Sequence, residues 1–104
     1  MAKRNLTLET GTYNGMDSIG IVGPFDQMDQ KVIEIARDIL SNDKKDIVLD
    51  FHKTTYITSM GIAVLLKLLK KTQKKGRTLY IANLTRDMQT ILTSASLDKY
   101  LTII

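Results

Sequence analysis

The 104-residue sequence contains no cysteine. This absence excludes disulfides, thiolate zinc sites, iron–sulfur clusters and cysteine nucleophiles, and it fits a reducing compartment. His52 is the only histidine, and no carboxylates lie at the spacing of metal ligands. We therefore expect neither a metal site nor a cofactor.

Long apolar runs are also absent, since none approaches the ~20 residues that a membrane-spanning helix requires. Lys3 and Arg4 lie close to the first residue, but no apolar segment follows them, so no signal peptide is expected. These two observations predict a cytoplasmic protein that is not embedded in a membrane.

The net charge is +4, and much of the basic charge lies between Lys67 and Arg77. Nucleic-acid-binding surfaces usually interleave such charges with aromatic or base-reading groups, and this segment has no aromatic residue. The pattern indicates a solvated helix end, where cations favour the negative end of the helix dipole. We therefore expect no nucleic acid as partner.

The first quarter of the chain has the pattern of a β-hairpin followed by a helix. Residues 5–10 and 18–22 predict two strands, joined by a connection that contains Asn14-Gly15. We expect the second strand to end at Gly23-Pro24, because proline has no N–H for a ladder. Asp26 is predicted to cap the following helix, which carries Asp29 in its first turn and apolar residues as far as Leu40.

The rest of the chain alternates strand and helix patterns. Residues 47–51 and 78–82 predict buried strands, and residues 101–104 are compatible with a last short strand. Thr58-Ser59 precedes a second helix with Gly76 as its C-terminal glycine, and Thr85 is placed to cap a third. Residues 1–104 are thus predicted to form a single α/β domain. We expect a mixed, mostly parallel sheet of four to five strands, an N-terminal hairpin and three to four helices.

No residue pattern in the sequence indicates a catalytic site. His52 would need a serine and an acid beside it in space to form a nucleophile triad, and nothing in the sequence places them there. No glycine-rich phosphate-binding pattern is present. Asp26 and Asp29 could perform acid–base chemistry, but capping a helix accounts for both. We predict that the protein is not an enzyme.

Thr58-Ser59-Met60-Gly61 lies where a strand-like segment meets the second predicted helix. A hydroxyl here can cap the helix, which stabilises it by about 1 kcal/mol. Alternatively it can be phosphorylated. A charge of about −1.5 to −2 would then face the unpaired N–H groups of the helix start and would repel an acidic or apolar partner. From these residues alone, capping is the simpler interpretation.

Three stretches resemble the STAS family, the domain of bacterial anti-sigma factor antagonists and of the tails of sulfate-type anion transporters. Residues 23–26 (GPFD) resemble the family's Gly-x-Leu-Asp, and residues 47–51 (IVLDF) resemble its central strand ending in Asp-Leu. Residues 56–63 (YITSMGIA) resemble its stretch containing Asp-Ser-Ser/Thr-Gly. The resemblance covers nearly the whole chain and implies the STAS fold.

In the antagonists, the first serine of Asp-Ser-Ser/Thr-Gly is phosphorylated by a partner anti-sigma kinase, and here that position is Ser59. The resemblance implies that the unphosphorylated protein sequesters an anti-sigma factor with serine-kinase activity. Phosphorylation would release this partner, and a phosphatase would reset the switch. The resemblance implies no catalysis and no cofactor, and we expect a monomer or weak dimer. The expected partner-binding residues are Asp26, Thr58, Ser59, Met60, Gly61 and Ile62.

The sequence departs from the family pattern on both sides of Ser59. Thr58 replaces the acid, which makes it a second candidate for phosphorylation, and Met60 replaces a serine or threonine. The missing acid leaves open a constitutive STAS scaffold subunit of a signalling or membrane transport complex, without phosphorylation. A small enzyme or nucleotide-binding domain of flavodoxin-like layout is a third interpretation.

Overall fold

The computed structural model describes residues 6–27, 30–42 and 46–104, and in these ranges it has six strands and three helices. The elements, in chain order, are β1 (Thr7–Tyr13), β2 (Met16–Phe25), α1 (Gln30–Asn42), β3 (Ile47–Asp50), β4 (Thr54–Ile57), α2 (Ser59–Lys74), β5 (Leu79–Ala82), α3 (Arg86–Ser94) and β6 (Thr102–Ile103). The predicted single α/β domain with an N-terminal hairpin is the fold observed, and the strand count exceeds the expected four to five by one.

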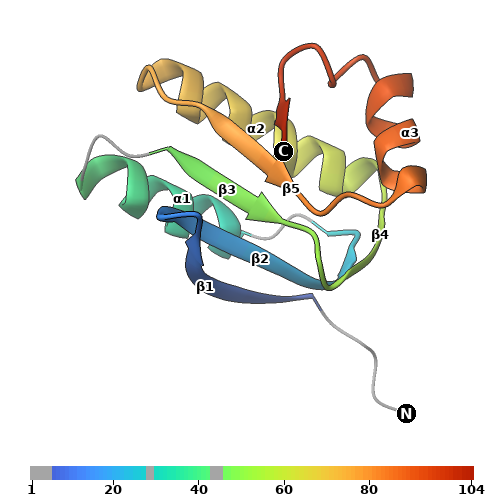
Figure 1. Ribbon diagram of the computed structural model, residues 1–104, viewed down its shortest axis with the longest axis horizontal. Helices are drawn as coiled ribbons and strands as arrows, with labels where there is room; N and C mark the ends of the chain where they lie inside the picture. Colours follow the sequence, from blue (N-terminus) through green and yellow to red (C-terminus); the bar gives the residue numbers. More distant parts are fainter. Residues whose placement is uncertain (1–5, 28–29, 43–45) are drawn as a thin grey trace.

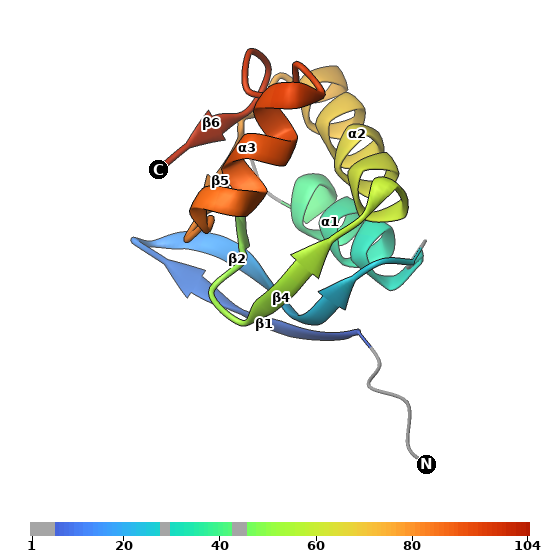
Figure 2. The same cartoon turned by 90° about the vertical axis from the view of Figure 1, so that its right-hand side faces the viewer.

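The strands form one mixed sheet in the order β1-β2-β3-β5-β6, and β4 pairs with the last part of β2. Among the strands that the structure describes, only the β1–β2 hairpin is antiparallel, and the other pairs are parallel. Helices α1 and α2 lie side by side against one face of the sheet (Figure 1). Seen from the end, α3 lies in front of the sheet, toward the side of β6 (Figure 2).

The hairpin is tighter than expected, because only Asn14 and Gly15 separate its strands. Both have positive φ, 49° and 80°, which is the backbone of a type I′ turn that follows the twist of the two strands. Pairing therefore begins directly beside the turn, with Tyr13 opposite Met16.

The expectation that the second strand ends at Gly23-Pro24 is wrong, since β2 continues to Phe25. The register shifts between Gly23 and Pro24, and Gly23 has a φ of +92°. This bulge turns the strand from β3 toward β4, so the missing N–H of Pro24 falls at an irregularity where the ladder is already interrupted. The Gly23 N–H donates to the carbonyl of Lys53 at 3.0 Å.

The expectation that Asp26 caps the first helix is also wrong, because α1 begins at Gln30. Asp29, expected in the first turn, lies outside the described residues. Two other helix ends are as predicted. Gly76 has a φ of +67° just beyond α2, and Thr85 Oγ1 accepts the N–H of Met88 at 3.2 Å at the start of α3.

The core lies between the sheet and the pair α1–α2. Strand β3 is buried on both faces, as its continuous apolar run predicts, and α2 contributes Val64, Leu65 and Leu68 with no exposure. The rings of Phe25 and Phe51 lie 5.9 Å apart, so the ends of β2 and β3 are packed together. Of the helices in the described ranges, none combines the length and the apolar character needed to cross a bilayer.

Candidate functional site

The carboxyl ends of the parallel strands bring together the residues that the sequence singles out. Asp26 follows β2, Thr58 and Ser59 follow β4, and Asn83 follows β5, while Asp50 is the last residue of β3. Because β2, β3, β4 and β5 run in the same direction, these residues lie at one end of the sheet (Figure 1). Asp26 and the start of α2 therefore lie at the same end of the sheet.

Ser59 is the first residue of α2, and its side chain is exposed. Its N–H and those that follow in the first turn have no partner within the helix. No acidic residue occupies that turn. The exposed hydroxyl thus lies at the positive end of the helix dipole, where an anion is favoured.

Thr58 occupies the N-cap position with extended backbone (φ −118°, ψ −179°), but its side chain forms no capping hydrogen bond. Its Oγ1 is buried and has no hydrogen-bond partner among the described residues. Neither hydroxyl of the Thr58-Ser59 pair therefore caps α2, unlike Thr85 at α3. Of these two candidate hydroxyls, that of Ser59 is the one on an exposed side chain.

Gly61, one of the expected partner-binding residues, is buried. Its lack of a side chain matters for the packing of α2 against β2. A Cβ at this position would collide with the carbonyl oxygen of Phe25 and come within 2.9 Å of Ile57 Cγ1. The Thr58 N–H donates to that same carbonyl of Phe25 at 3.1 Å. Gly61 lets the start of α2 lie directly on the end of β2, and this contact holds Ser59 at the edge of the sheet.

The other expected binding residues differ in exposure. Met60 is 45% exposed and Ile62 is half-buried against the core. Tyr56 is 50% exposed, and its hydroxyl donates to Oδ2 of Asp26 at 3.1 Å. This hydrogen bond, with smaller contributions from desolvation and from the carboxylate charge, raises the pKa of Tyr56 above its ordinary value. The surface around Ser59 therefore presents a methionine, a tyrosine and a carboxylate.

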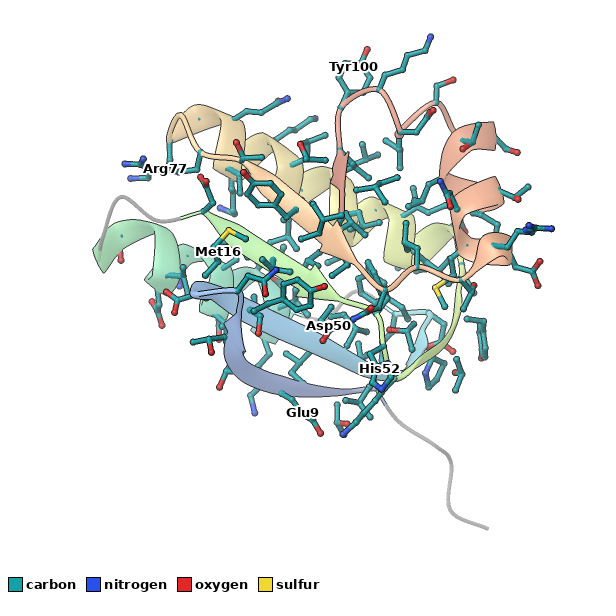
Figure 3. The ribbon with its side chains drawn as sticks, in the orientation of Figure 1. Glu9, Met16, Asp50, His52, Arg77 and Tyr100 are labelled. Atoms are coloured by element: carbon teal, nitrogen blue, oxygen red, sulfur yellow. The ribbon has the colours of Figure 1, made fainter. Side chains whose placement is uncertain are left out.

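A second set of contacts joins the ends of β3 and β5. Oδ1 of Asp50 accepts the backbone N–H of His52 at 2.9 Å and Nδ2 of Asn83 at 2.8 Å. Asn83 has a φ of +61°, a left-handed conformation that asparagine tolerates better than most residues. Figure 3 shows Asp50 at the end of β3 and His52 on the segment that leads from β3 to β4. These hydrogen bonds to Asp50 fix the loop that precedes β4, and hence the positions of Tyr56 and Ser59.

Sequence patterns alone identify neither Tyr56 as the partner of Asp26 nor the pairing of Asp50 with Asn83. The available signal was topological, since a polar residue that directly follows a buried parallel strand lies beside its equivalents on neighbouring strands. In the described part of the chain, no three His, Cys, Asp or Glu side chains are placed to hold a metal ion. The site thus consists of the exposed Ser59 hydroxyl at the start of α2 and the surrounding surface formed by Met60, Tyr56 and Asp26.

Residues 19–104 match the STAS domain family, and the chain belongs to that family. None of the curated proteins compared with the chain gives a significant match. The single α/β domain described above is consistent with the family match.

Three solved structures are similar to this chain in fold. The anti-sigma factor antagonist SpoIIAA in its unphosphorylated form is 14% identical, with a TM-score of 0.61 over 96% of this chain and 87% of its own. A sulfate transporter family protein from Wolinella succinogenes is 17% identical, with a TM-score of 0.64 over 89% and 80%. A serine-to-glutamate variant of RsbS from Moorella thermoacetica is 15% identical, with a TM-score of 0.68 over 93% and 85%.

Proposed function

We propose that this protein is an anti-sigma factor antagonist, a protein-binding module that acts in the cytoplasm and is switched by phosphorylation of Ser59. In its unphosphorylated form it sequesters an anti-sigma factor that is also a serine kinase. One observation carries the proposal: the Ser59 hydroxyl is exposed at the first residue of α2, while the neighbouring Thr58 hydroxyl is buried. The likeness in fold to SpoIIAA supports it.

The start of α2 suits a modified serine. A phosphate carries a charge of about −1.5 to −2 at neutral pH. At Ser59 it would face the first-turn N–H groups, and no acid in that turn opposes it. The fold can therefore accept the dianion without unfolding, and the main effect of the charge falls on whatever protein contacts this surface.

The surroundings of Ser59 suit a protein partner. Met60 and Tyr56 are 45% and 50% exposed, and both residue types are enriched in protein interfaces. Asp26 holds the Tyr56 hydroxyl, so the ring is positioned before the partner arrives. An interface that covers this apolar and aromatic surface would desolvate Ser59, and a phosphate buried there would be strongly unfavourable.

The test is phosphorylation by an anti-sigma factor with serine-kinase activity from the same organism. Incubation with that kinase and ATP should add a single phosphate, which mass spectrometry should locate on Ser59. Ser59→Ala should abolish the labelling, and the matched variant Thr58→Val should leave it intact because the Thr58 hydroxyl is buried. Labelling that persists in Ser59→Ala would contradict the proposal.

A second candidate function is a constitutive STAS scaffold subunit, of a signalling assembly or of a membrane transport complex. The observation that favours it is Thr58, which stands where the family's motif has an acid. Similarity to a sulfate transporter family protein is consistent with this candidate. It predicts a stoichiometric complex in a pull-down from the native cell and no phosphorylated pool of the protein.

A further inference from the structure

The exposed face of α2 continues from Ser59 along the whole helix. Ser59, Ala63, Leu66, Lys70 and Lys74 follow one another at intervals of three or four residues, which places them on one side of a helix. Lys67 lies beside them. Leu66 is 38% exposed, and Lys67, Lys70 and Lys74 are exposed. We call these six residues the α2 stripe, which is uncharged in its first half and basic in its second.

The basic half of the α2 stripe is electrostatically unfavourable in the isolated chain. Lys67 and Lys71, like Lys70 and Lys74, are four residues apart, where like charges destabilise a helix. Lys53 pairs with Glu9 at 3.3 Å, but none of the α2 lysines forms an ion pair with a residue in the described ranges. Residues 51–86 contain no aspartate or glutamate at all.

The helix dipole explains only part of this charge. Its effect is confined to about the last turn, where Lys71 and Lys74 lie. Lys67 and Lys70 lie nearer the middle of the helix, so the dipole does not account for them. Arg77 extends the positive charge beyond the helix, at the end of the molecule opposite His52 (Figure 3). The lysines are therefore an unpaired positive surface that lacks an acidic complement within the described chain.

We propose that the α2 stripe docks an acidic polypeptide surface of the partner, whose carboxylates pair with Lys67, Lys70 and Lys74 while its apolar residues cover Leu66 and Met60. This inference rests on the proposed function, because it extends the surface around Ser59 along the same helix. Charge complementarity and this continuity identify the occupant. A lipid surface fits less well, since the apolar face of α2 is buried in the core and cannot insert. A nucleic acid fits less well because no aromatic residue accompanies the lysines.

The proposal gives the two ends of the α2 stripe opposite effects on one acidic partner. Ser59 and Lys67 are separated by about 12 Å along the helix axis, which exceeds the Debye length of about 8 Å at physiological salt. The lysines attract the partner whether or not Ser59 carries a phosphate. A phosphate at Ser59 places a dianion against the apolar residues of the same partner and opposes docking.

The probe is poly-L-glutamate of about 12 residues, which can span the stripe in an extended conformation. It is titrated into the full ¹⁵N-labelled chain. Amide shifts should concentrate on α2 from Leu66 onward, and binding should weaken steeply with added salt.

The triple variant Lys67→Gln/Lys70→Gln/Lys74→Gln should bind about 10-fold more weakly. The matched control Arg37→Gln/Arg86→Gln/Lys99→Gln loses the same charge from exposed sites and should stay within about 2-fold of the unmodified chain.

Equal weakening by the two triple variants would overturn the proposal, because it would mean that net charge alone attracts the polyanion. Preferential binding of the α2 stripe to vesicles of three parts phosphatidylcholine to one part phosphatidylglycerol, or to a short DNA duplex, would also overturn it. Polyglutamate binding requires neither the kinase nor a phosphate on Ser59. Failure of the kinase assay would thus reject the proposed function and leave polyglutamate binding to the α2 stripe unaffected. Equal weakening of polyglutamate binding by the two triple variants would reject the α2 stripe and leave Ser59 phosphorylation unaffected.

Discussion

The Tyr56 hydroxyl donates to Oδ2 of Asp26 across 3.1 Å, and this bond joins the end of β4 to the segment that follows β2. Both residues lie at the carboxyl end of the sheet, beside Ser59 at the start of α2. Asp26 therefore positions an exposed aromatic ring near the proposed switch, in place of the helix-capping role that its sequence context suggests.

The first prediction concerns pH. The hydrogen bond to Asp26 raises the pKa of Tyr56, because the neutral phenol is the donor and the carboxylate opposes a phenolate. The bond's contribution to stability is therefore fully present below the ordinary pKa of tyrosine and is lost as pH rises through the raised pKa of Tyr56. NMR titration of the Tyr56 ring should show this elevation, and Asp26→Ala should remove most of it, because only the smaller contribution from desolvation remains. An unchanged titration in Asp26→Ala would contradict the assigned cause.

The second prediction concerns Gly61. Gly61→Ala places a methyl group against the carbonyl of Phe25 and within 2.9 Å of Ile57 Cγ1, so the start of α2 must move away from β2. We expect a loss of about 1–3 kcal/mol in the free energy of unfolding, measured by urea denaturation. Gly11→Ala is the matched control, because its Cβ would meet only Ser18 Oγ at an ordinary 3.7 Å. Equal effects of the two substitutions would refute the close approach.

The third prediction distinguishes a buried Thr58 hydroxyl without a hydrogen-bond partner from a Thr58 hydroxyl that caps α2. Its Oγ1 is buried without a partner, so Thr58→Val keeps the shape and removes an unsatisfied polar atom. We expect the free energy of unfolding to stay the same or to rise by about 1 kcal/mol. A capping threonine would behave in the opposite way, since its loss costs about 1 kcal/mol. Thr85→Val at the start of α3, where the cap is formed, supplies that contrast.

The fourth prediction concerns the hydrogen bond that joins the ends of β3 and β5. Asn83 has a φ of +61° and donates to Asp50 at 2.8 Å. Asn83→Ala and Asn83→Gly both lose this hydrogen bond, but only alanine also has a Cβ in the left-handed conformation. Thermal unfolding should show Asn83→Ala less stable than Asn83→Gly by about 1 kcal/mol. The reverse order would mean that the backbone at Asn83 is not held in this conformation.

The sequence predicts the fold well because its strong patterns are local and periodic. The buried run at residues 47–49, the apolar spacing in α2, Gly76 and Thr85 all behave in the structure as their residue types dictate. The errors arise where tertiary contacts decide. Pro24 lies within β2 because a bulge at Gly23 redirects the strand, and α1 begins later than Asp26 implies.

The candidate site is only partly predictable, for the same reason. Topology brings Asp26 and Ser59 to one end of the sheet, which the order of strands and helices already implies. Which hydroxyl is exposed depends on how α2 packs on Phe25, and periodicity does not contain that information. Gly61 is informative only once its Cβ is placed against the neighbouring strand.

The most direct test of the central claim is the affinity of the kinase partner for this protein with and without a phosphate on Ser59. Isothermal titration should show tight binding of the unphosphorylated chain and a loss of at least about 100-fold on phosphorylation, because a dianion would be buried in the interface. Ser59→Asp should weaken binding in the same direction, and Ser59→Ala should bind as the unmodified chain does. Equal affinities for the phosphorylated and unphosphorylated protein would contradict the switch.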